Sequence, residues 1–115
     1  MINPIPNSYG LTEITFYTES DIKAGMTVSV DKNGNAIIAP ENYPFIGICT
    51  KAEGNYITVA VSGVITAGYT GAFSECGYQY MSGDGNGNIK YDITSDYEHP
   101  VLKVDTENRT VTIIL

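Results

Sequence analysis

The segment with the clearest spacing for chemistry is Ser82–Asn88, SGDGNGN, together with the residues that follow it. Carboxylate and amide oxygens there fall at positions 1, 3, 5 and 9 of a calcium-binding loop; they belong to Asp84, Asn86, Asn88 and Asp92. Such a loop needs glycine at position 6 and a bidentate glutamate at position 12, where this chain has Ile89 and Ser95. A glycine-rich hairpin turn uses the same residue types for their backbone conformation. We therefore predict a turn and no metal site. The glycines do not indicate a dinucleotide loop either, because strand patterns flank them on both sides.

Other reactive side chains are few and scattered. His99 is the single histidine and stands in the polar turn YEHP, where spacing places neither a nucleophile nor an orienting acid beside it. A zinc site needs three or four ligands, and His99 could add only Cys49 and Cys76, which are distant in sequence. We therefore expect that the chain is not an enzyme and that it binds no metal ion or cofactor. The sequence does not reveal catalytic carboxylate pairs whose members are distant in sequence and meet only in the folded chain.

Aromatic side chains offer a different kind of site. The chain has nine tyrosines, three phenylalanines and no tryptophan. Tyr78 and Tyr80 are two residues apart and so lie on one face of a strand, and Tyr91 can share that face. Tyrosine provides apolar area with a polar hydroxyl, which suits protein interfaces and carbohydrate stacking. These three residues are candidate surface-binding residues, although the core and rim of a small barrel is the ordinary place for a tyrosine.

The composition favours strands as the elements that position these groups. Val, Ile and Thr together number 34, against three Leu and seven Ala. β-Branched side chains fit a pleated surface, whereas good helix formers are scarce. Twelve Gly and five Pro provide many turns. The chain is therefore expected to be all-β.

The strand pattern runs along most of the chain. Residues 26–30 alternate apolar and polar side chains, and Asn33-Gly34 is a strong hairpin signal. A closing hairpin is expected across residues 106–108, and the one place for a short helix is 69–77. About eight to ten short strands in a chain of 115 residues indicate a small closed or partly closed β-barrel or sandwich. The residues predicted to form its core are Val28, Ile46, Val59, Val61, Val104, Val111 and Ile113.

The first ten residues differ from the rest of the chain. Two prolines fix the backbone and donate no hydrogen bonds, so residues 1–10 are predicted to be an extended arm preceding a single β domain at 11–115. The arm carries apolar and polar side chains suited to contact with a partner: Ile2, Asn3, Pro4, Ile5 and Pro6.

Charge and hydropathy limit the partners. The formal net charge of −7 opposes binding to nucleic acid or to an anionic membrane. We expect no signal peptide, and no apolar run reaches the roughly 20 residues that span a bilayer. The chain is expected to be made in a host cytoplasm with its cysteines reduced, and the pairing of Cys49 with Cys76 stays open.

The order of elements over residues 19–64 resembles the small head-decoration, or capsid-cement, proteins of tailed bacteriophages. The shared pattern is a strand after Ala24-Gly25, the hairpin, Ile46-Gly47-Ile48, a long strand and Ser62-Gly63-Val64. The resemblance implies a structural protein on the outer surface of a phage or prophage virion. It would clamp neighbouring major capsid subunits, act as a homo-oligomer with a trimer favoured, and lay its arm on the capsid.

The second half of the chain departs from the simplest of those proteins. The segment 69–99 is longer than the corresponding part of those proteins and is rich in tyrosine and glycine, which suggests an outward-facing insertion. The alternative function is a carbohydrate- or host-surface-binding β-module of a phage fibre or bacterial surface protein.

Overall fold

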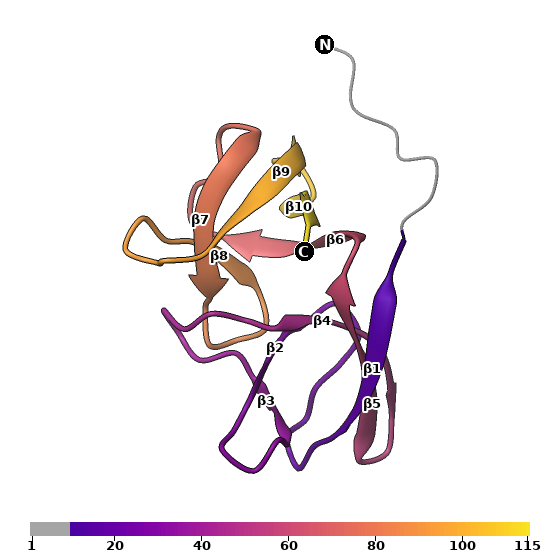
Figure 1. Ribbon diagram of the computed structural model, residues 1–115. Coiled ribbons are helices and arrows are strands. Elements are labelled where there is room, and N and C mark those ends of the chain that lie inside the picture. Colours follow the sequence, from indigo (N-terminus) through magenta and orange to yellow (C-terminus); the bar gives the residue numbers. More distant parts are fainter. Residues whose placement is uncertain (1–9) are drawn as a thin grey trace.

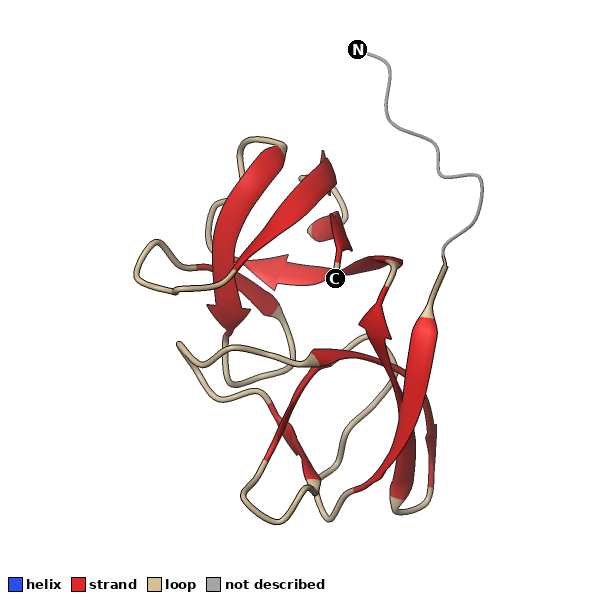
Figure 2. Cartoon of the chain, in the orientation of Figure 1, coloured by secondary structure: helices blue, strands red, loops and turns tan. Residues whose placement is uncertain are grey.

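The computed structural model describes residues 10–115, which consist of strands and loops (Figures 1 and 2). The ten strands are β1 (Thr12–Tyr17), β2 (Thr27–Val30), β3 (Ala36–Ile38), β4 (Gly47–Glu53), β5 (Tyr56–Ser62), β6 (Val64–Thr70), β7 (Gly77–Gly83), β8 (Ile89–Tyr91), β9 (Glu98–Asp105) and β10 (Thr110–Ile114). The all-β prediction is confirmed. Within residues 10–115 no helix is long and apolar enough to cross a membrane.

The predicted arm lies outside the described residues, apart from Gly10. The same holds for its five candidate contact residues: Ile2, Asn3, Pro4, Ile5 and Pro6.

Strands β1–β5 form the N-lobe, an antiparallel sheet in the order β1-β5-β4-β2-β3. The predicted hairpin joins β2 to β3, and Asp31 Oδ1 stabilises its turn by accepting hydrogen bonds from the N–H groups of Asn33 and Asn35 at 2.8 and 3.0 Å. The buried Thr18 hydroxyl, just after β1, donates to the carbonyl of Ala36 in β3 at 2.8 Å. The two edges of the sheet therefore approach each other at one end, and the sheet is curved around a small core of Ile22, Val28, Ala36, Cys49, Ile57 and Val59.

Strands β6–β10 form the C-lobe, a closed barrel in the order β10-β6-β8-β7-β9. The chain passes from β5 to β6 at Gly63, whose φ of 105° is a conformation that side chains rarely adopt. Strands β6 and β8 are parallel, and the other neighbours are antiparallel.

The segment 69–99 is not an outward-facing insertion. It provides β7 and β8, and its last two residues begin β9, so it builds much of the barrel wall. The one place considered for a short helix, residues 69–77, holds none, because Tyr69 and Thr70 end β6 and a loop follows. Glycines at 71 and 77, both with positive φ, interrupt the segment where a helix would need to continue.

The two lobes share an apolar core. Phe45 and Ile48 from the N-lobe are buried in the cluster that fills the barrel. Four of the seven predicted core residues are completely buried: Val28, Val59, Val111 and Ile113. The other three are partly buried against the two clusters: Ile46, Val61 and Val104.

Candidate functional site

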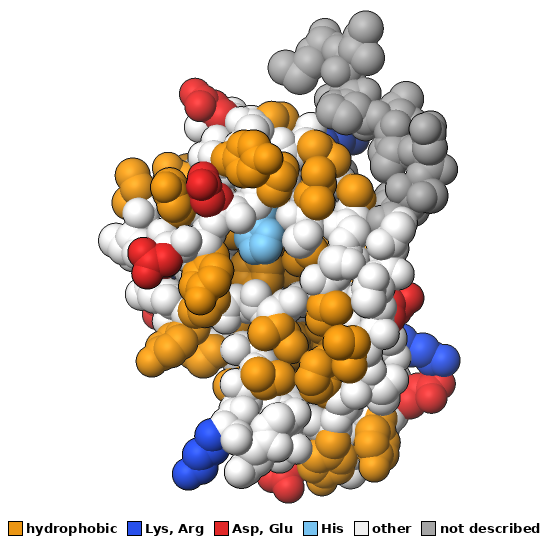
Figure 3. All heavy atoms as spheres, in the orientation of Figure 1, with side chains coloured by type: hydrophobic (Ala, Val, Ile, Leu, Met, Phe, Trp, Pro, Cys, Tyr) orange, Lys and Arg blue, Asp and Glu red, His pale blue; other side chains and the backbone are white. Residues whose placement is uncertain are grey.

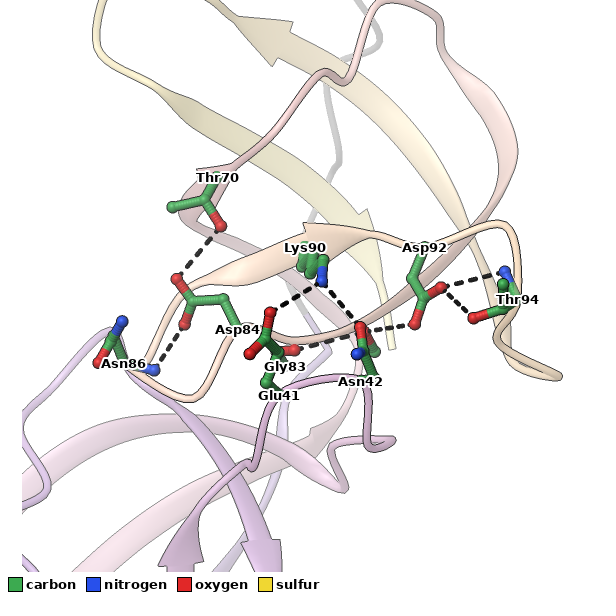
Figure 4. A network of polar contacts seen from close by, with 10 residues as sticks. Glu41, Asn42, Thr70, Gly83, Asp84, Asn86, Lys90, Asp92 and Thr94 are labelled. Atoms are coloured by element: carbon green, nitrogen blue, oxygen red, sulfur yellow. Dashed lines mark hydrogen bonds and ion pairs between the residues drawn. The ribbon is translucent and has the colours of Figure 1, made fainter.

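The four residues at calcium-loop positions are not gathered in one place. Asp84 and Asn88 are in contact, with Asn88 Nδ2 donating to Asp84 Oδ2 at 3.2 Å, but Asp92 belongs to another loop. Asp84 Oδ1 accepts hydrogen bonds from the N–H groups of Asn86 and Asn88 at 2.7 and 2.9 Å, and Oδ2 accepts from the Thr70 hydroxyl at 3.2 Å (Figure 4). Burial alone would raise the pKa of Asp84, but the donors of Asn88, Asn86 and Thr70 together hold it below its usual value. This carboxylate is therefore engaged in closing its own turn.

Asp92 serves a different loop. It is buried and accepts hydrogen bonds from the hydroxyls of Thr94 and Ser82 at 2.5 and 2.9 Å. The Thr94 hydroxyl is the main cause of the lowered pKa of Asp92, against the opposing effect of burial. Figure 4 shows Asp84 and Asp92 on opposite sides of Lys90, each with its own hydrogen-bond partners. Among the described residues, no three His, Cys, Asp or Glu side chains are grouped to hold a metal ion.

His99 lies where the lobes meet. Its ring stacks on the buried ring of Phe45, with centroids 5.4 Å apart and planes 15° apart, and Nδ1 lies 3.1 Å from the carbonyl oxygen of Ile114. Figure 3 shows the imidazole in a hollow of the surface, surrounded by hydrophobic side chains. Burial lowers the pKa of His99, and the carbonyl of Ile114 offsets part of this effect. The geometry indicates a packing role for the neutral ring.

We expect the free energy of unfolding to decrease as the pH falls below about 6.5, the usual pKa of histidine. The pKa of His99 is lower in the folded chain, so its contribution is fully present above the unfolded pKa and is lost as pH falls through the folded pKa. His99→Phe keeps the ring stacking but cannot be protonated. Urea unfolding from pH 7.5 to 5 should give a flatter pH dependence for this variant than for the parent. Because the chain has one histidine, identical slopes would contradict the assignment.

The two cysteines are not paired. Cys49 is buried in the N-lobe and Cys76 is exposed, and both are free thiols. Burial raises the pKa of the Cys49 thiol, so it behaves as a small apolar side chain and not as a nucleophile.

The surface feature that stands out is a group of large exposed side chains around β7. Tyr78 is 72% exposed and Tyr80 39% exposed, and both project from the outer face of this strand. Two loops bonded to β7 add further exposed side chains. The carbonyl of Tyr43 accepts from the N–H of Gly83 at 2.9 Å, and that of Tyr97 accepts from the N–H of Met81 at 3.1 Å. We call Tyr43, Tyr78, Tyr80, Ile93 and Tyr97 the aromatic face.

The charge around the aromatic face is negative. Glu98 is the direct neighbour of Tyr80 across the β7–β9 pair, and the exposed Asp96 lies in the loop that carries Tyr97. The nearby Lys90 is held by Glu41 and Asn42 at 3.2 and 2.8 Å. Figure 3 shows hydrophobic side chains with acidic ones between them on this side of the molecule. The face therefore suits a partner with apolar area and positive charge.

Tyr91 does not share the face of Tyr78 and Tyr80. It pairs with the buried Met81, which places it on the inner face of the barrel wall, and its ring meets that of Phe73 edge to face at 5.6 Å. The suggestion that Tyr91 can share this face was wrong, because the register between β7 and β8 decides its face and the sequence alone does not give that register. Tyr91 instead lines an open hollow of about 260 Å³, together with Ala72, Phe73, Ser74, Glu75 and Gln79.

Three members of the aromatic face were not predicted. Tyr43, Ile93 and Tyr97 lie in loops, and the hydrogen bonds that bring those loops to β7 join residues distant in sequence. An exposed aromatic residue in each polar loop was the available signal. Comparison of the chain with protein-family models, with curated proteins and with solved structures gave no match.

Proposed function

We propose that this protein is a structural binding module that decorates the outside of a phage or prophage head and clamps neighbouring major capsid subunits. The observation that supports this most is the aromatic face. Tyrosines provide large apolar area at low cost in side-chain entropy and are enriched where proteins bind each other. Five large apolar side chains, each at least 39% exposed, lie on β7 or on loops hydrogen-bonded to it, and exposed apolar side chains gathered in this way mark binding surfaces.

A decoration protein needs no reactive site. Stable interfaces bury about 1,600 Å² in total, and many copies on one shell multiply a modest gain in free energy for each. The carboxylates of the C-lobe that first suggested chemistry are engaged in turns. The acidic surrounding of the aromatic face favours a basic apolar surface on the major capsid protein, with steering that weakens as salt rises.

Binding to undecorated capsids tests the proposal. We expect Tyr78→Ala to weaken binding at least about tenfold, equivalent to 1.4 kcal/mol, because truncation removes exposed aromatic area without touching the core. Tyr56→Ala is the matched control, since Tyr56 is also exposed but lies in the N-lobe. Co-sedimentation with capsids assembled from the cognate major capsid protein measures both. If the parent and Tyr78→Ala bind equally well, the aromatic face is not part of the interface with the capsid. If the parent does not bind, the proposed function is wrong.

The same assay addresses the predicted arm. A chain beginning at Leu11 retains both described cores, so we expect it to melt close to the parent. If Ile2 to Pro6 contact the capsid, its binding should also decrease at least about tenfold.

Carbohydrate binding is the second candidate, because Tyr80 and Glu98 are neighbours on one exposed face. A sugar ring can stack on a tyrosine while its hydroxyls donate to a carboxylate. A glycan array probed with the parent and with Tyr80→Ala separates the two functions. Glycan binding that is lost in Tyr80→Ala, without capsid binding by the parent, would favour the second.

A further inference from the structure

Strand β1 forms an open edge of the N-lobe sheet, and this edge is separate from the aromatic face. Strand β1 is the last strand of the N-lobe sheet, and among residues 10–115 it pairs only with β5 (Figure 1). One side of its backbone therefore presents N–H and C=O groups that no strand of the described part of the chain pairs. The opposite edge is different, because β3 has three residues and the Thr18 hydroxyl occupies the Ala36 carbonyl. The N-lobe thus has one long open edge.

Within the residues that the structure describes, this edge lacks the features that usually prevent strand pairing. Proteins protect edges with lysine, proline, bulges or covering segments. Strand β1 contains no Lys, Arg or Pro, and its one charge belongs to Glu13, whose carboxylate accepts a hydrogen bond from the Thr50 hydroxyl at 2.6 Å. A bulge lies between Thr12 and Glu13, so residues 13–17 remain regular.

The side chains of β1 are also poorly covered. Ile14 pairs with the buried Val59 and therefore lies on the inner face of the sheet, yet 46% of its surface is exposed. Phe16 pairs with the buried Ile57 and is only partly buried itself. The inner face at this edge has the apolar residues of a core, but no neighbour among residues 10–115 completes it.

We propose that β1 pairs with β1 of a second copy, antiparallel and about a two-fold axis at Thr15. The regular stretch Glu13–Tyr17 is centred on Thr15, so this register uses all of it and leaves out the bulge. An antiparallel pair about a two-fold axis keeps the inner faces of both sheets on one side. Ile14 of each copy then faces Phe16 of the other, the kind of cross-strand contact that stabilises a sheet.

The charge on β1 is compatible with pairing to a second copy of the chain. In the register about Thr15, each Glu13 faces Tyr17 of the second copy, so the strand places no like charges opposite each other. A two-fold interface uses the same patch on both copies, and a self-complementary strand satisfies this requirement. The net charge of −7 on each copy opposes association, so the dimer should strengthen as salt screens the repulsion. This symmetry differs from the trimer implied by the resemblance.

Analytical ultracentrifugation of the full chain tests the proposal, at 10 μM to 1 mM and at low and high salt. We expect a monomer–dimer equilibrium that shifts toward dimer with salt. Thr15→Lys places two ammonium groups opposite each other at the axis and should weaken association at least tenfold. Thr15 is exposed in the monomer, so the fold should tolerate the change. Thr106→Lys is the matched control, with the same charge change in an exposed turn of the C-lobe.

A second measurement reads the register directly. In a Cys76→Ser background, which removes the exposed thiol, Thr15→Cys should form a disulfide-linked dimer on mild oxidation, because residues opposite each other in an antiparallel pair have close Cβ atoms. Thr106→Cys should remain monomeric. A parent chain that is monomeric throughout, a trimer, or a Thr15→Lys variant that associates as well as the parent would overturn the proposal. Capsid binding plays no part in either measurement, so these outcomes are independent of the proposed function.

Discussion

Val111→Asp is expected to unfold the chain at 25 °C. Val111 is completely buried in the barrel core and pairs with Ala67 on one side and Val104 on the other. A carboxylate there would lose its hydration without gaining a partner, which costs several kcal/mol. That is a large part of the roughly 5 to 15 kcal/mol that stabilise a small domain. Far-UV circular dichroism and the dispersion of the proton NMR spectrum measure the loss.

Ile114→Asp is the control for this prediction. It makes the same kind of change on the same strand, but Ile114 is 37% exposed, so its carboxylate can remain hydrated and the variant should stay folded. The N-lobe should unfold with the C-lobe in Val111→Asp, because Phe45 and Ile48 belong to the barrel core. If Val111→Asp melts like the parent, the register of β10 is wrong. If only half of the NMR signals collapse, the lobes are less coupled than their shared core implies.

The class of fold could be predicted because its signals are local. The excess of β-branched residues, the Asn33-Gly34 turn and the alternation at residues 26–30 each act over a few residues, and the structure contains those strands. The closing hairpin was predicted for the same reason. The division into two lobes was not predicted. It depends on the parallel β6–β8 pair and on loop contacts between residues about 40 apart, for which local periodicity carries no information.

The candidate site could be predicted only in part, for a related reason. Tyr78 and Tyr80 share a face because strand geometry fixes a period of two, and the structure places both on the outer surface. Tyr91 required the register of a second strand, and Tyr43 and Tyr97 required the paths of two loops. The turn at Asp84 could be recognised from composition, because Asp, Asn and Gly act through their own backbone there.

Gly83→Ala is expected to lower the free energy of unfolding by about 3 kcal/mol, near the upper end for overpacking of a well-packed site. Gly83 lies where the lobes touch, and a Cβ there would stand 2.6 Å from Ala39 Cβ and 2.8 Å from the Ala39 carbonyl oxygen. Backbone atoms cannot move aside as the end of a side chain can. The loop over residues 39–43 would have to withdraw, which strains the hydrogen bonds of Gly83 with Asn42 and Tyr43, at 3.1 and 2.9 Å.

Gly68→Ala separates this close contact from the general effect of replacing a glycine in a strand. Its Cβ would meet Asn88 Oδ1 at 2.8 Å, an atom at the end of a side chain that can rotate, so the loss should be well below that of Gly83→Ala. Urea unfolding gives both values. Hydrogen exchange then shows where Gly83→Ala is destabilised. The N–H groups of Asn42 and Gly85 bond across the lobes, so they should lose protection in this variant before the N–H groups within β10. Equal stability of the two variants would show that the lobes do not depend on this contact. Loss of protection throughout both lobes, without an earlier loss at Asn42 and Gly85, would mean that the interface opens only when the whole chain unfolds.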